Sequence, residues 1–125
     1  MTRIVNPYRD RIQERKPIVS DSVLLHQWSR ERPTCYFTDS GPFDHTVILQ
    51  THHIVGGMNR SDEPCNLVRV CDRCHQRIHR TYGRGEVIPL GLVLAAKMLW
   101  DPAEFDVQRI EELLGHTLTI GEAFR

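Results

Sequence analysis

The sequence predicts a small α+β fold in which a β-hairpin and the helix after it are embedded among flanking α-helices. Two short runs rich in β-branched or apolar residues, 46–51 and 67–70, predict the hairpin. Apolar residues at helical spacing predict helices on both sides of it. A chain of 125 residues is long enough for one modest core and too short for two, so we expect a single domain over residues 1–125.

An arm and a helix are expected in residues 1–34. The first 19 residues contain two prolines and show no period, which predicts an extended arm that wraps the core. A path along DNA is the alternative for this arm. Ser20 or Asp21 then caps a helix that runs to about Arg32, because the apolar residues after the cap recur at helical spacing.

Residues 35–81 contain the hairpin, its helix and most of the histidines. His52 and His53 follow the first strand-like run, and neighbouring residues on a strand point to opposite faces. His75 and His79 are four residues apart on the predicted helix, so their imidazoles project from one face, one turn apart. This spacing suits a metal site that one of the two adjacent histidines completes, while the other is left for a different role.

A helical segment is expected in residues 82–125. Pro89 suits the first turn of a helix that ends near Trp100, and Gly115 suits the end of another. Residues 101–125 carry six acidic residues against two arginines. These helices serve as packing elements or, alternatively, as a surface for a protein partner or for self-association.

Charge is distributed unevenly along a chain whose formal net charge is zero. A neutral total argues against a protein coated with basic residues for bulk nucleic-acid binding. Residues 52–84, however, carry six arginines against three acidic residues, which indicates a locally positive face at the histidines.

These residues together resemble the HNH endonuclease family, also called His-Me finger or ββα-metal nucleases. The similarity is closest to the double-histidine branch that includes the colicin DNases, and it spans roughly Cys35 to Arg80. It is carried by these positions: His52-His53-Ile54, Gly56-Gly57, Asn66-Leu67, Cys71-x2-Cys74-His75 and His79.

The resemblance implies a ββα-metal finger that hydrolyses DNA phosphodiester bonds and leaves 5′-phosphate and 3′-hydroxyl ends. It implies that His53 is the general base and that Asn66 fixes the loop and the base. It also implies one catalytic divalent metal that stabilises the leaving oxygen, held by His52, His75 and His79. An all-imidazole set favours Zn²⁺, Ni²⁺ or Mn²⁺, while Mg²⁺ stays an alternative because water and phosphate oxygens complete the shell.

A second, structural Zn²⁺ is implied less directly. Many family members pair two Cys-x2-Cys motifs, but in this chain Thr38 stands where the second cysteine of the first motif would be. Thiolates are the usual ligands of structural zinc and threonine is not. The remaining candidates are Cys35, Cys71 and Cys74, with Cys65, His45 or Asp39 as the fourth ligand; alternatively the zinc is lost and packing holds this region.

DNA is the expected partner, and arginines around the motif are expected to contact its phosphates. The alternative is that they pair with the acidic C-terminal segment. The rival function is a non-catalytic zinc-finger module for DNA binding or assembly. The sequence has no secretory signal or membrane span, so we expect a cytoplasmic location, in bacteria or in the host of a phage. The arginines expected to contact DNA phosphates are Arg60, Arg69, Arg73, Arg77 and Arg80.

Overall fold

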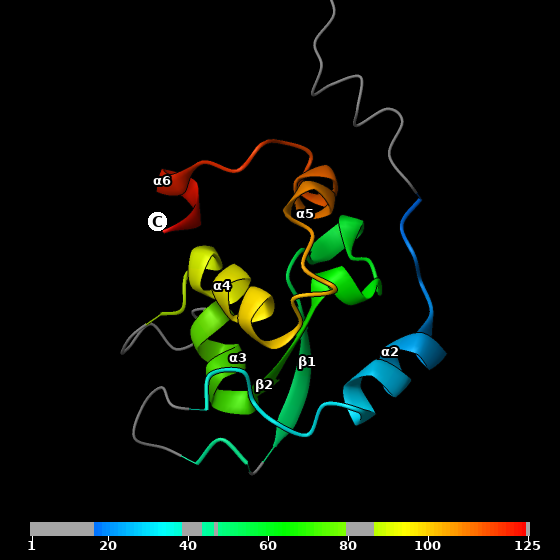
Figure 1. The fold of residues 1–125 in the computed structure, drawn as a ribbon, viewed down its shortest axis with the longest axis vertical. Helices are drawn as coiled ribbons and strands as arrows, with labels where there is room; N and C mark the ends of the chain where they lie inside the picture. The colour runs from blue at the N-terminus through cyan, green and yellow to red at the C-terminus, as the bar shows by residue number, and fades with distance from the viewer. Residues whose placement is uncertain (1–16, 39–43, 47, 80–86, 125) are drawn as a thin grey trace, which may run out of the picture.

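The computed structural model describes residues 17–38, 44–46, 48–79 and 87–124 (Figure 1). These residues form a two-stranded antiparallel sheet and several helices, a mixed helix and strand structure that is compatible with the predicted α+β class. Most of the predicted arm lies outside the described residues. The elements are α2 (Ser22–Arg30), β1 (Leu49–His53), β2 (Leu67–Cys71), α3 (Asp72–His79), α4 (Leu90–Trp100), α5 (Val107–Leu114), α6 (Ile120–Ala123) and two 3-10 turns, Gly57–Asn59 and Pro64–Asn66.

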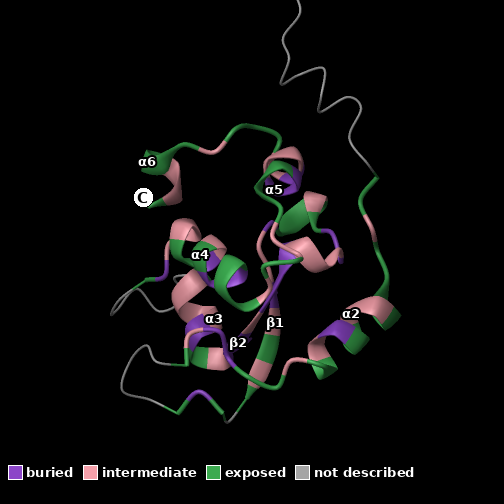
Figure 2. Ribbon diagram, in the orientation of Figure 1, coloured by how far each residue is buried: buried purple, intermediate pink, exposed green. Residues whose placement is uncertain are grey.

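The hairpin of β1 and β2 lies at the centre of the molecule (Figure 1). Leu49 pairs with Cys71 and His53 pairs with Leu67, so β1 begins later than predicted and includes both adjacent histidines. Helix α3 follows β2 directly, and α4 packs against β2. Figure 2 shows buried residues along β2 and at the start of α3.

Helix ends follow the predicted capping residues closely. The Asp21 side chain accepts hydrogen bonds from the backbone N–H groups of Val23 and Leu24, which settles the choice between Ser20 and Asp21. Gly115 ends α5 with a φ of 87°, a left-handed conformation that a glycine adopts without a Cβ clash.

A buried ionic cluster connects α2 to the end of α4. The Lys97 ammonium is fully buried and lies 3.0 Å from Asp101 Oδ2 and 2.8 Å from Glu104 Oε1. Arg32 pairs with the same two carboxylates, at 3.2 and 2.7 Å. Two cations therefore balance two acids, and removal of one partner would leave an uncompensated buried charge. These acidic residues of the C-terminal segment are thus paired within the fold.

Within the described part of the chain, no helix combines the length and the apolar character that crossing a bilayer requires.

Candidate metal centres

Three cysteines and one histidine from three separate segments converge beside the hairpin. Cys35 lies before residues 39–43, which are outside the described part of the chain, and His45 lies after them. Cys71 and Cys74 lie at the junction of β2 and α3. All four side chains are buried. Their ligand atoms all lie within 4.8 Å of one another, so this cluster could hold a metal ion such as zinc.

The distances fit a tetrahedral site. His45 Nδ1 lies 3.5 Å from Cys35 Sγ and 3.4 Å from the Sγ atoms of Cys71 and Cys74. A nitrogen and a sulfur at their usual distances from one zinc ion, at a tetrahedral angle, are about 3.5 Å apart. The side chains are therefore already spaced as zinc ligands.

Thiol ionisation in this cluster is strongly uneven. Hydrogen bonding to Cys74 lowers the pKa of Cys35 to about 5 in spite of its burial. The same hydrogen bond, together with burial, raises the pKa of Cys74, and burial raises the pKa of Cys71. Cys35 is therefore the thiol whose ionised form is favoured most, and a cation between the three sulfurs would favour ionisation of Cys71 and Cys74 as well.

His45 is the candidate fourth ligand that the fold selects. Cys65 lies elsewhere, with its Sγ 3.6 Å from Glu63 Oε2, and burial beside that carboxylate raises the pKa of Cys65 to about 12. Asp39 lies outside the described residues. Thr38 is exposed and lies outside the four buried side chains of the cluster.

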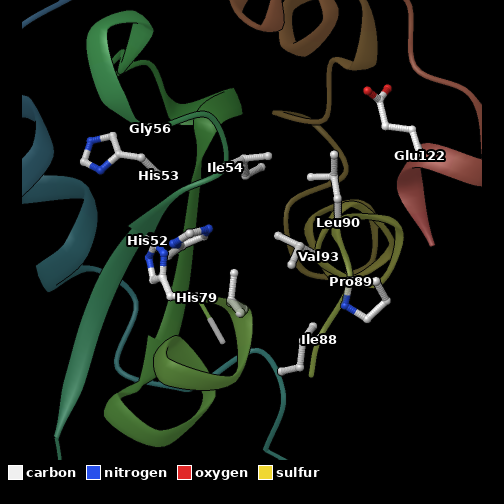
Figure 3. Close-up of a pocket in the computed structure, with 11 residues that line it drawn as sticks. His52, His53, Ile54, Gly56, His79, Ile88, Pro89, Leu90, Val93 and Glu122 are labelled. Carbon is white, nitrogen blue, oxygen red and sulfur yellow. The ribbon is translucent and has the colours of Figure 1, made fainter. Parts of the chain in front are cut away.

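A second cluster consists of His52 from β1 and His75 and His79 from α3. Their ring centroids are 4.7 to 5.1 Å apart, and Figure 3 shows the rings of His52 and His79 lying together. The Nε2 atoms of His75 and His79 are 3.0 Å apart. Two nitrogens bound to one metal are about 2.9 Å apart at a right angle and about 3.3 Å apart at a tetrahedral angle. These three residues could therefore fill three coordination positions of a metal ion and leave its other positions open.

Both protonation and tautomer favour metal binding by these histidines. Burial and the neighbouring imidazoles lower the pKa of His52 to about 3, and the same causes lower that of His75. Both rings are therefore neutral near pH 7. His75 Nδ1 lies 2.6 Å from Gln50 Oε1, which only accepts, so its proton is on Nδ1 and the Nε2 lone pair faces the cluster.

The two clusters differ in exposure. The cysteine cluster is enclosed, while His75 is half-buried and His79 is exposed. His52 and His79 also line a hollow of about 410 Å³ whose opposite wall is formed by apolar residues of α4 and the segment before it, including Pro89 and Val93 (Figure 3). Structural zinc sites are closed, and catalytic sites keep an open position.

His53 does not join the three-histidine cluster. Its ring extends away from His52 and His79, as alternation along a strand requires (Figure 3). His53 Nε2 lies 2.8 Å from Asp62 Oδ1, and both side chains are 10% exposed. Burial tends to raise the pKa of Asp62, but the hydrogen bonds from His53 and from the Asp21 N–H hold it below its ordinary value. Sequence patterns do not single out Asp62, because one acid in a polar loop gives no signal.

Asn66 closes the loop between the strands. It is fully buried, its Oδ1 accepts from the Val55 N–H at 2.8 Å, and its Nδ2 donates to the carbonyl oxygens of Val55 and Ser61 at 3.0 and 2.9 Å. The Asn66 carbonyl oxygen also accepts from the Ile54 N–H at 2.7 Å. One amide therefore fixes the chain on both sides of the loop that follows His53.

The arginines expected at DNA have different surroundings. Arg60 and Arg73 are exposed, and Arg77 is half-buried. Arg69 makes internal contacts, with Nε 2.9 Å from the Arg32 carbonyl oxygen and a second donor 3.2 Å from Thr51 Oγ1. Arg80 lies outside the described residues. Arg69 thus contributes to the packing of β2, whereas the side chains of Arg60 and Arg73 are exposed.

Replacing Cys74 with serine should remove one metal ion per chain and lower the free energy of unfolding by about 4 kcal/mol or more, because the cluster joins three segments. Elemental analysis and denaturant unfolding measure the two effects. Cys65→Ser is the matched control and should keep both metal content and stability. Equal metal loss in the two variants would contradict the assignment of Cys65 outside the site.

Comparison of the chain with protein-family descriptions, with curated proteins and with solved structures gave no match. The interpretation of the two clusters therefore rests on their geometry and on the sequence motif.

Proposed function

We propose that the protein is a metal-dependent endonuclease that hydrolyses DNA phosphodiester bonds, with residues 35–81 as a ββα-metal finger. The observation that carries the proposal is an enclosed cysteine-histidine cluster next to an open three-histidine cluster, with the same helix α3 contributing ligands to both. The enclosed cluster is suited to a structural zinc ion. The open cluster is suited to chemistry, and the cytoplasm is the proposed location.

The residues around the open cluster have separate roles in this proposal. His52, His75 and His79 hold a divalent ion, which, when bound, supplies charge stabilisation to the departing oxygen. His53 accepts a proton from the attacking water, since its ring is not engaged in the three-histidine cluster. Asn66 keeps the loop after His53 in one conformation through four hydrogen bonds.

A second candidate function is a non-catalytic module for DNA binding or assembly. It is favoured by the low exposure of His53, whose side chain is only 10% exposed and is paired with Asp62. A base has to reach water, and a buried hydrogen bond between a histidine and a carboxylate also serves to hold loops together. Activity measurements separate the two candidates.

His53→Ala should lower metal-dependent nicking of plasmid DNA by about 10² to 10⁴-fold, the usual contribution of a general base. Metal content should stay close to that of the wild type, because His53 is outside both clusters, and the protein should stay folded with a modestly lower melting temperature, because Asp62 loses its partner. His79→Ala should instead weaken metal binding at the open cluster, as elemental analysis and calorimetric titration would detect. His26→Ala, on the exposed side of α2, is the control.

Wild-type protein that is fully loaded with metal and cleaves no DNA would contradict the proposal and favour the non-catalytic module. Loss of metal in His53→Ala, with retention in His52→Ala, would reverse the roles of these two residues.

Arginines at the surface should raise the affinity for DNA by contacting phosphates, and they should not favour any particular base sequence. Arg73→Ala and Arg60→Ala should each flatten the salt dependence of DNA binding by about one unit of slope, equally for unrelated sequences. Arg69→Ala is the matched control, because its guanidinium contacts Arg32 and Thr51. It should lower the melting temperature and leave the slope unchanged. An unchanged slope for both exposed arginines would contradict phosphate contact at these positions.

A further inference from the structure

We infer that Asp62 is a positioning residue for His53 and fixes Nδ1 as the nitrogen that accepts the proton from water. This inference rests on the proposed nuclease function. It adds Asp62, which is not part of the sequence motif, and it names the nitrogen of His53 that acts as the base. It follows from the hydrogen bonds around one carboxylate.

The contact between Asp62 and His53 determines the tautomer of the imidazole. Asp62 Oδ1 lies 2.8 Å from His53 Nε2. An ionised carboxylate only accepts hydrogen bonds, so Nε2 must carry the proton. A neutral imidazole has one N–H group, and Nδ1 is therefore the nitrogen with a free lone pair.

Asp62 is itself held in place by the segment 17–21. Its Oδ2 accepts from the Asp21 backbone N–H at 2.8 Å, and its own N–H donates to the Val19 carbonyl oxygen at 2.7 Å. Each carboxylate oxygen therefore has a different partner, and rotation of the carboxylate would break one of the two bonds. Because His53 is hydrogen-bonded to this carboxylate, the orientation of its imidazole is fixed as well.

The charge of Asp62 also matches the proposed step. An O–H bond of water breaks as its proton moves to His53 Nδ1, and the resulting hydroxide forms a bond to phosphorus. The bond from phosphorus to the leaving oxygen then breaks, and that oxygen keeps the electron pair and takes a proton from solvent. His53 becomes an imidazolium, which an adjacent carboxylate stabilises, as in other carboxylate-histidine pairs.

Other contacts already connect the same two segments, so Asp62 is not needed merely to hold them together. The Val19 N–H donates to Ser61 Oγ at 3.1 Å. Arg109 pairs with Glu63 at 2.6 Å and donates to the Pro17 carbonyl oxygen at 3.1 Å. Ser61 is the neighbour of Asp62 in the same loop, and its hydroxyl bonds to the segment that also holds Asp62. Ser61→Ala is thus a matched control for a purely structural effect.

The test combines kinetics with the tautomer of His53. Metal-loaded protein is assayed on duplex DNA, and the ring nitrogens of His53 are observed by ¹⁵N NMR. Asp62→Ala should lower kcat by about 10-fold or more, within the loss that His53→Ala causes, and should change KM little. Asp62→Asn should not restore kcat, because its one carboxamide oxygen stays with the Asp21 N–H and its N–H group then faces His53 Nε2, which moves the imidazole proton to Nδ1. Ser61→Ala should lower the melting temperature, because the hydrogen bond to Val19 is lost, and should leave kcat unchanged.

A double variant decides whether Asp62 acts through His53. Adding Asp62→Ala to His53→Ala should cause no further loss of kcat, since the group that Asp62 positions is already gone. In the wild type, ¹⁵N shifts should report a proton on Nε2 of His53, and Asp62→Ala should produce a mixture of tautomers.

Three results would overturn the inference: a proton on Nδ1 in the wild type, a further loss of kcat in the double variant, or an equal loss in Ser61→Ala and Asp62→Ala. If the wild type cleaves no DNA, the proposed nuclease function fails. The NMR measurement still tests the Asp62–His53 contact in that case, so the two failures are distinguishable.

Discussion

The constraint on which the rest of the structure depends is that one short helix carries ligands of both clusters. Helix α3 has eight residues, fewer than an isolated helix needs to be stable in water. Cys71 and Cys74 flank its start, and the Cys74 N–H lies 3.4 Å from Cys71 Sγ. His75 and His79 follow within the next turn. A metal at the cysteines would therefore hold the helix start in place and so fix the direction in which both histidines project.

The loop between the strands is held by a second set of contacts, which are independent of any metal. Asn66 closes it from inside, and Asp62 and Glu63 connect it to the segment 17–21 and to α5. The two members of the double histidine thus depend on different supports. His52 is positioned by the hairpin against α3, and His53 by the loop and its carboxylates. This division agrees with the separate roles proposed for them.

The sequence predicted the elements better than it predicted their connections. Hydrophobic period and capping residues placed α2 and α5, and short β-branched runs placed the hairpin approximately, because these signals are local. The His75 and His79 pair was also local, since a helix of any origin brings positions four apart together. The choice of His45 over Cys65 was not predictable, because it depends on how the chain returns to Cys71. The same holds for Asp62, whose partners are His53 and a residue 41 positions earlier.

The most direct test of this account is X-ray absorption on protein loaded with one and then two equivalents of zinc. The first equivalent should show three sulfur neighbours at about 2.3 Å and one nitrogen at about 2.0 Å. The second should show nitrogen and oxygen neighbours only, including water. Failure to bind a second equivalent, or sulfur around both ions, would contradict an enclosed cysteine site beside an open histidine site.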